Sequence, residues 1–109
     1  MTDSLHLPDR HRATIEALVR EHLPDVEVWA YGSRANGRSH EGSDLDLILR
    51  GPGLRKIPLD CLAGFTDALR ESTIPFLVEA RDWARAPERF HQQIESEHIV
   101  LIAAGESSE

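Results

Sequence analysis

The chain has 109 residues, of which 19 are acidic and 12 are lysine or arginine, and its formal net charge is −7. A chain of this length can bury one core, so we expect a single domain over residues 1–109. The negative charge repels nucleic-acid backbones, and aromatic residues make up only 6% of the chain. Direct binding to nucleic acid is therefore not expected.

The predicted elements alternate between helices with one apolar stripe and short strands. In chain order we expect a helix that Pro8 and Asp9 can open and that covers 13–22, a strand over 26–31, a short helix just after Ser33, a strand over 45–49, a helix after Pro58, a strand over 76–80 and a helix from Pro87 that includes Ile99. This order predicts an α/β (α+β) domain with a small central sheet of about three or more strands. Residues 103–109 are small and polar and are expected to form a disordered tail.

Cysteine content and hydrophobicity favour a cytoplasmic protein. Cys61 is the single cysteine, so no internal disulfide and no zinc site built from several thiolates can form. Its apolar neighbours suggest an inert core thiol. No run of apolar residues approaches the length of about 20 needed for a membrane span, and the first ten residues do not resemble a signal peptide. We expect no membrane association.

Two aspartates begin the strand expected over 45–49. Side chains two residues apart share one face of a strand, so Asp44 and Asp46 can point toward one site while Leu45, Leu47 and Leu49 face the core. Two ionised carboxylates on one face repel each other and favour a divalent cation between them, most simply Mg²⁺. Taken alone, the pattern is equally compatible with acidic residues on a solvent-exposed strand face.

Gly32 and Ser33 follow the strand expected over 26–31. Glycine lets the backbone approach a ligand closely, and N–H groups at the start of a helix favour phosphate. Ser33 adds a hydroxyl group and Arg34 adds a positive charge. Alone, these residues fit an ordinary strand-to-helix turn with Ser33 as the cap. The combination of Gly-Ser, ten further residues and Asp-x-Asp, with a strand on each side, is more specific.

The segment GSRANGRSHEGSDLDL resembles the DNA polymerase β-type nucleotidyltransferase superfamily, and within it the minimal nucleotidyltransferases that are partners of HEPN-domain toxins. The resemblance extends from about Arg12 to Leu101, where IPFLVEARDWA and FHQQIESEHIVL resemble the third strand and the closing helix. It implies a mixed sheet flanked by helices. It also implies an antitoxin that uses Mg²⁺ to transfer AMP from ATP to a hydroxyl of its toxin, in a hetero-oligomer, with release of pyrophosphate.

The third acidic residue of that superfamily lies on the third strand, where this chain has Glu79 in place of the usual aspartate. Val78 and Ala80 are expected to face one way and Glu79 the other. The extra methylene of glutamate can displace the carboxylate by about an ångström, a change that is costly in a catalytic group, so it affects turnover more than nucleotide binding. The plainer interpretation is a solvated acidic residue on an edge strand.

The resemblance also implies a role for each residue of the site. One Mg²⁺ ion would bind the triphosphate and a second would activate the acceptor hydroxyl, while Glu79 would serve as general base or third metal ligand. The implied nucleotide-binding residues are Gly32, Ser33 and Arg34, and the implied catalytic and metal-binding residues are Asp44, Asp46 and Glu79.

Other polar and aromatic residues are interpreted structurally. His91 and His98 share one face of the expected last helix but lack a third ligand at metal-binding spacing. Trp29 and Tyr31 either line the site or pack under a helix. Arg38, His40 and Glu41 are expected to be solvated loop residues. Trp83 is expected to lie in the core or in an interface.

Three alternatives to a protein adenylyltransferase remain. The first is a non-catalytic antitoxin that neutralises its partner by binding alone, although three retained carboxylates argue against a degenerate site. The second is a transferase acting on a small-molecule hydroxyl, which would need a further surface to hold the acceptor. The third is a non-enzymatic metal-binding module, which would leave the placement of Gly32 and Ser33 unexplained.

Overall fold

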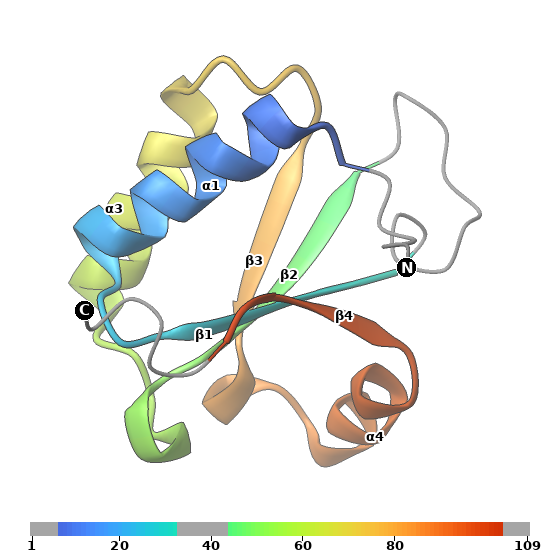
Figure 1. Cartoon of the computed structure of the whole chain (residues 1–109). Coiled ribbons are helices and arrows are strands. Elements are labelled where there is room, and N and C mark those ends of the chain that lie inside the picture. Colours follow the sequence, from blue (N-terminus) through green and yellow to red (C-terminus); the bar gives the residue numbers. More distant parts are fainter. Residues whose placement is uncertain (1–6, 33–43, 104–109) are drawn as a thin grey trace.

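The computed structural model describes residues 7–32 and 44–103. A mixed four-stranded sheet in the order β3-β2-β1-β4 separates two helical layers (Figure 1). The strands are β1 (Glu27–Tyr31), β2 (Leu45–Arg50), β3 (Val78–Asp82) and β4 (His98–Ile102). The helices are α1 (Asp9–His22), α3 (Leu59–Glu71) and α4 (Glu88–Ser96), with short 3₁₀ turns η1 (Pro52–Leu54) and η2 (Trp83–Arg85).

The main core lies between the sheet and helices α1 and α3. Strand β2 is central, antiparallel to β1 and parallel to β3, while β4 pairs antiparallel with the other edge of β1. Alternate residues of β2, namely Leu45, Leu47 and Leu49, are fully buried against this layer. Ile15 of α1 and Phe65 of α3 are equally buried and fill the space opposite them. Burial of these apolar side chains fixes which face of each strand turns inward.

A second, smaller cluster covers part of the opposite face. Trp29, Ile48, Trp83 and Ile94 are buried there, and Phe90 of α4 packs against them. Because α4 and η2 cover only the portion of the face near these residues, the polar side chains near the start of β2 are not enclosed by this cluster. The sheet therefore has one fully packed face and one face that is divided between an apolar cluster and a polar site.

The expected α/β fold with a mixed central sheet and flanking helices is confirmed. The first helix begins at Asp9, directly after Pro8, which are the two residues expected to open it. The third strand covers Val78–Asp82 instead of residues 76–80. Cys61 is half-buried and packs against the main core. Among the described residues, no helix combines the length and hydrophobicity needed to cross a membrane.

The prediction of a helix extending to Ile99 is wrong. Helix α4 ends at Ser96, and residues His98–Ile102 form strand β4. The segment HIVLI is rich in β-branched residues, which favour strands, and it pairs with the free edge of β1. His91 and His98 consequently do not share a helical face. The short helix expected after Ser33 and residues 104–109 of the expected tail lie outside the described residues.

Candidate active site

Three adjacent strands place a tyrosine and two carboxylates in one row across the sheet. Asp46 of β2 lies opposite Tyr31 of β1 and also opposite Glu79 of β3. Residues in register on neighbouring strands project to the same face, and here this is the face opposite Leu45 and Leu47. Two acidic side chains that are 33 positions apart in sequence thus become nearest neighbours through the parallel pairing of β2 and β3.

The electrostatics of this row centre on Asp46. Partial burial raises the pKa of Asp46, the nearby charge of Glu79 raises it further, and Asp44 adds a smaller effect in the same direction. Arg81 opposes these effects and lowers the pKa. The carboxylates of Asp44, Asp46 and Glu79 are therefore close enough to repel each other. Such a cluster binds cations more readily than an isolated surface carboxylate does.

Gly32, which directly follows β1, lies beside the Asp46 carboxylate. Its φ of +83° is a conformation that residues with a side chain rarely adopt, and a Cβ built there would lie 2.6 Å from Oδ2 of Asp46. Glycine is therefore needed for both its backbone angle and its lack of a side chain. The structure thus gives Gly32 a packing role beside Asp46, in addition to the phosphate-binding role expected from the sequence.

Arg81 is a member of this site that the sequence interpretation missed. Its Nη2 lies 3.5 Å from Oε1 of Glu79, and its guanidinium lies 5.6 Å from the ring centre of Phe90. Burial raises the pKa of Tyr31, with a further contribution from Asp46, whereas a hydrogen bond with Arg81 lowers it. Arg81 therefore supplies the positive charge that balances part of the acidic row. Its spacing of two residues from Glu79 was the available signal.

The described residues provide only part of a metal-binding shell. No group of three histidine, cysteine, aspartate or glutamate side chains within residues 7–32 and 44–103 is arranged to hold a metal ion. Mg²⁺ is commonly held by one or two carboxylates together with substrate phosphates and water. The paired carboxylates of Asp46 and Glu79, with Asp44 nearby, fit that requirement because they offer hard oxygen ligands and leave positions for a triphosphate.

Several sequence-predicted residues are not part of the described structure. Ser33 and Arg34, which were expected to hold phosphate, lie outside residues 7–32 and 44–103, as do the loop residues Arg38, His40 and Glu41. Of the nucleotide-binding set, the structure therefore describes Gly32 alone. Of the expected catalytic set, it describes all three carboxylates and brings Asp46 beside Glu79.

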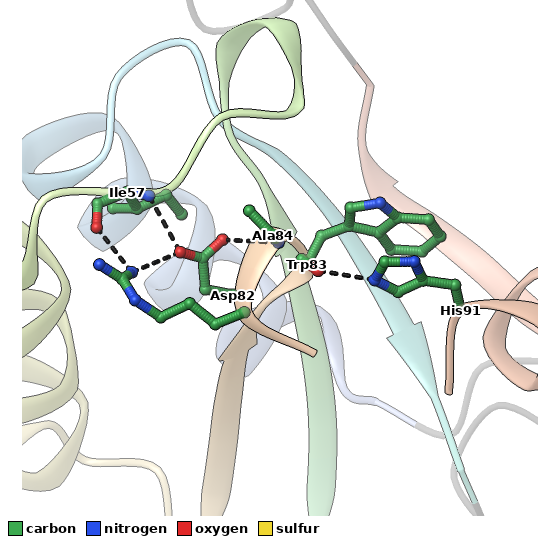
Figure 2. Close-up of polar contacts among 6 residues, drawn as sticks. Ile57, Asp82, Trp83, Ala84 and His91 are labelled. Carbon is green, nitrogen blue, oxygen red and sulfur yellow. Dashed lines mark hydrogen bonds and ion pairs between the residues drawn. The ribbon is translucent and has the colours of Figure 1, made fainter. Parts of the chain in front are cut away.

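The end of β3 is fixed by a buried carboxylate next to the site. Asp82 is only 4% exposed, and it accepts hydrogen bonds from the backbone N–H of Ile57 at 2.9 Å and of Ala84 at 3.1 Å (Figure 2). It also forms an ion pair with Arg85, whose guanidinium donates to the carbonyl of Ile57 at 2.8 Å. These contacts tie β3 to the segment before α3 and so hold Glu79 in register.

The two histidines first considered as metal ligands pack against tryptophans. The ring of His91 stacks on Trp83 with centroids 3.9 Å apart, and its Nε2 lies 2.6 Å from the carbonyl oxygen of Trp83 (Figure 2). The ring of His98 stacks on Trp29, also at 3.9 Å. The expected structural interpretation of these histidines and of Trp83 agrees with these contacts, and Trp29 packs under α4 in the smaller cluster.

Comparison with known proteins agrees with this arrangement. The family model for the nucleotidyltransferase domain matches residues 12–101. A curated relative, the probable protein adenylyltransferase MntA of Haemophilus influenzae, is 33% identical over 99 residues, which cover 89% of this chain and 83% of the relative.

Solved structures share the fold at low sequence identity. A crystal structure of a toxin–antitoxin with AMP-PNP has a TM-score of 0.71 and 19% identity, covering 86% of this chain and 74% of the other. A crystal structure of a mutant of the toxin–antitoxin MntA–HpeT has a TM-score of 0.70 and 17% identity, with the same coverage. The family match spans most of the chain and includes Gly32, Asp44, Asp46 and Glu79, and the chain is therefore an enzyme of the nucleotidyltransferase family.

Proposed function

We propose that this nucleotidyltransferase transfers AMP from ATP to a hydroxyl group of a partner protein. The observation that carries the proposal is the register between β2 and β3, which sets Asp46 beside Glu79 on a sheet face that the apolar cluster leaves uncovered. Gly32 lies so close to the Asp46 carboxylate that a side chain at position 32 would clash with it. The similarity to a probable protein adenylyltransferase supports a protein as the acceptor.

In the proposed reaction the acceptor oxygen attacks the α-phosphorus of ATP. A new bond forms between that oxygen and phosphorus, the bond to the oxygen bridging the α- and β-phosphates breaks, and pyrophosphate leaves. Glu79 accepts the hydroxyl proton as general base. Asp46 and Asp44 would hold two Mg²⁺ ions, which when bound neutralise charge on the phosphates and favour deprotonation of the acceptor. The alternative role of Glu79 is that of third metal ligand. Gly32, Ser33 and Arg34 would contact the triphosphate.

We propose that the acceptor is a HEPN-type toxin and that this chain is its antitoxin. The resemblance of GSRANGRSHEGSDLDL to minimal nucleotidyltransferases supports this assignment, as does the similarity to proteins of toxin–antitoxin complexes. A complex of the two chains would supply a surface that holds the acceptor. The cytoplasmic location and the single-domain organisation expected from the sequence stay predictions.

The test is AMP transfer from ATP labelled at the α-phosphate, with Mg²⁺ and the protein encoded by the adjacent gene. Glu79→Gln keeps the shape of the side chain but cannot take a proton, so we expect transfer to slow by about 10²–10⁴-fold while MgATP binding persists. Glu71→Gln, an exposed change at the end of α3, is the matched control and should transfer normally. Asp46→Asn should lose both transfer and metal-dependent ATP binding.

The alternatives predict different results. If the wild-type protein binds its partner and protects cells but labels no partner residue, neutralisation occurs by binding alone and the transferase proposal is wrong. If label appears on an added small-molecule alcohol and not on the protein, the acceptor class is wrong. Mass spectrometry of the labelled partner would identify the modified hydroxyl.

A further inference from the structure

Among residues 7–32 and 44–103, no strand pairs with the backbone groups on the outer edge of β3, next to Glu79. The N–H of Leu45 donates to the carbonyl of Leu77 at 2.9 Å, and the parallel register continues through Asp46 and Glu79. In such a ladder the backbone groups of Glu79 are turned toward β2, whereas those of Val78 and Ala80 are turned to the outside.

A groove runs along this edge between the two helical layers. Two adjoining cavities of about 260 Å³ and 270 Å³ share Ala80 and Arg81 as lining residues. Helix α3 lines one side with residues four apart on one stripe, and the segment from η2 to α4 lines the other. These wall residues are Leu62, Thr66 and Arg70 on the side of α3, and Ala86, Pro87 and Phe90 on the side of α4. Figure 1 shows β3 at the edge of the sheet, farthest from β4.

The groove presents exposed arginines although the chain as a whole carries a net charge of −7. Its lining contains Arg70, Arg81 and Arg85 but only two carboxylates, Glu79 and Asp82. Asp82 is buried and pairs with Arg85. Arg70 and Arg81 lie beside Asp67 and Glu79, but their side chains are 72% and 52% exposed and can share a further carboxylate. Leu77 at the start of β3 is 52% exposed and adds an apolar contact. This combination of free strand edge, apolar walls and arginines suits an extended acidic peptide.

We propose that the acceptor segment of the partner protein binds along β3 as an additional strand. The inference rests on the proposed function, because it assigns the direction from which the acceptor hydroxyl reaches the same site. On an added strand, the residue opposite Glu79 projects to the same face as Glu79 and Asp46. A tyrosine at that position therefore extends over the site where the α-phosphate is attacked.

The register also specifies the sequence around the tyrosine. Residues two positions apart on a strand share a face, and Arg81 lies two residues after Glu79. An aspartate or glutamate two positions from the acceptor tyrosine therefore lies opposite Arg81 and can pair with it. Apolar residues between them face α3 and contact Leu62 and Thr66. The occupant is thus an extended segment with an acidic residue two positions from a tyrosine.

Amide hydrogen exchange measured by NMR tests the docking mode directly. The probe is a short synthetic peptide with a central tyrosine, glutamate two positions to either side and valine between. We expect saturable binding that slows exchange of the Val78 and Ala80 amides by about tenfold or more, because a paired amide is protected from solvent. The amides of β4, at the opposite edge of the sheet, are the internal control and should not change.

Two pairs of variants extend the test. Val78→Pro removes an outward N–H without removing a bond to β2, so it should weaken peptide binding and AMP transfer tenfold or more relative to Val78→Ala, which keeps the N–H. Arg70→Glu should weaken binding, while Arg20→Glu on α1 makes the same charge change at an exposed position outside the groove and should not. If Val78→Pro does not fold by circular dichroism, the Arg70 pair decides.

The outcomes separate this inference from the proposed function. If folded Val78→Pro and Arg70→Glu both transfer AMP to the partner normally, docking along β3 is wrong but the proposed transferase activity stands. Protection of Val78 and Ala80 by the peptide, with no transfer to any acceptor, supports the groove and overturns the transferase. The docking proposal is wrong if the peptide does not bind or if it protects the amides of β4 equally. It is also wrong if Val78 and Ala80 become protected without peptide as the protein concentration rises. That last result would identify a second copy of this chain as the occupant of the groove.

Discussion

Replacement of Gly32 by alanine tests how the end of β1 packs against Asp46. The φ of +83° at Gly32 costs a residue with a side chain about 1–2 kcal/mol. The added Cβ would also lie 2.6 Å from Oδ2 of Asp46, so the carboxylate must rotate away at a further cost of about 0.5–1.5 kcal/mol. We therefore expect Gly32→Ala to lower the free energy of unfolding by about 1.5–3.5 kcal/mol.

Urea denaturation in two backgrounds separates the two contributions. In Asp46→Ala the carboxylate is absent, so adding Gly32→Ala should cost only the backbone part, about 1–2 kcal/mol. The difference between the two backgrounds measures the contact between residues 32 and 46. Equal costs in both backgrounds, or no cost in either, would refute the packing role given to Gly32.

The same substitution should affect activity more than stability. A displacement of about 1 Å in a catalytic group can reduce the rate by about 10²-fold, so AMP transfer by Gly32→Ala should fall by roughly that factor while most of the protein stays folded. A fall in stability with normal transfer would show that the position of the Asp46 carboxylate is not critical for the reaction.

Three further predictions concern the charges around the site. Burial and the charge of Glu79 raise the pKa of Asp46, so the ionised carboxylate destabilises the folded state at any pH above the pKa of Asp46 in the unfolded chain. Asp46→Asn should therefore raise the melting temperature at pH 7. This gain should disappear as the pH falls below the unfolded pKa. Because the charge of Arg81 lowers the pKa of Asp46, Arg81→Gln should raise that pKa, which an NMR titration of the Asp46 carboxyl carbon would detect. An unchanged titration would contradict this electrostatic effect of Arg81. Asp82→Ala leaves Arg85 and a buried N–H of Ile57 without their partner, so it should reduce the free energy of unfolding by about 3–5 kcal/mol, and a loss below about 1 kcal/mol in urea denaturation would show that water replaces the carboxylate.

Local patterns in the sequence determined most of the elements and the facing of their side chains. The alternation of Leu45, Leu47 and Leu49 with polar residues predicted which face of β2 is buried, and the structure agrees. The opposite facing of Val78 and Glu79 follows from the same period of two. These features depend on neighbouring residues only, so they can be derived without knowledge of the rest of the fold.

The incorrect predictions concern segments whose local sequence pattern is compatible with more than one structure. HIVLI is a short apolar run that periodicity cannot assign to a helix or a strand, and only the free edge of β1 decided that it forms β4. The strand predicted over 76–80 ended one residue before Arg81, and Arg81 was therefore not assigned to the site. In the structure β3 continues to Asp82, whose buried hydrogen bonds to Ile57 and Ala84 hold the end of the strand.

The sequence by itself determined the family, the acidic residues and the face of each strand on which they lie. Only the tertiary structure decided that Glu79 lies opposite Asp46, that Gly32 contacts the Asp46 carboxylate and that β3 is an edge strand. Strand order and register arise from long-range pairing, in which segments distant in sequence compete for the same hydrogen-bonding edges and buried area. Alternation along one strand specifies a face, but it carries no information about which strand lies beside it.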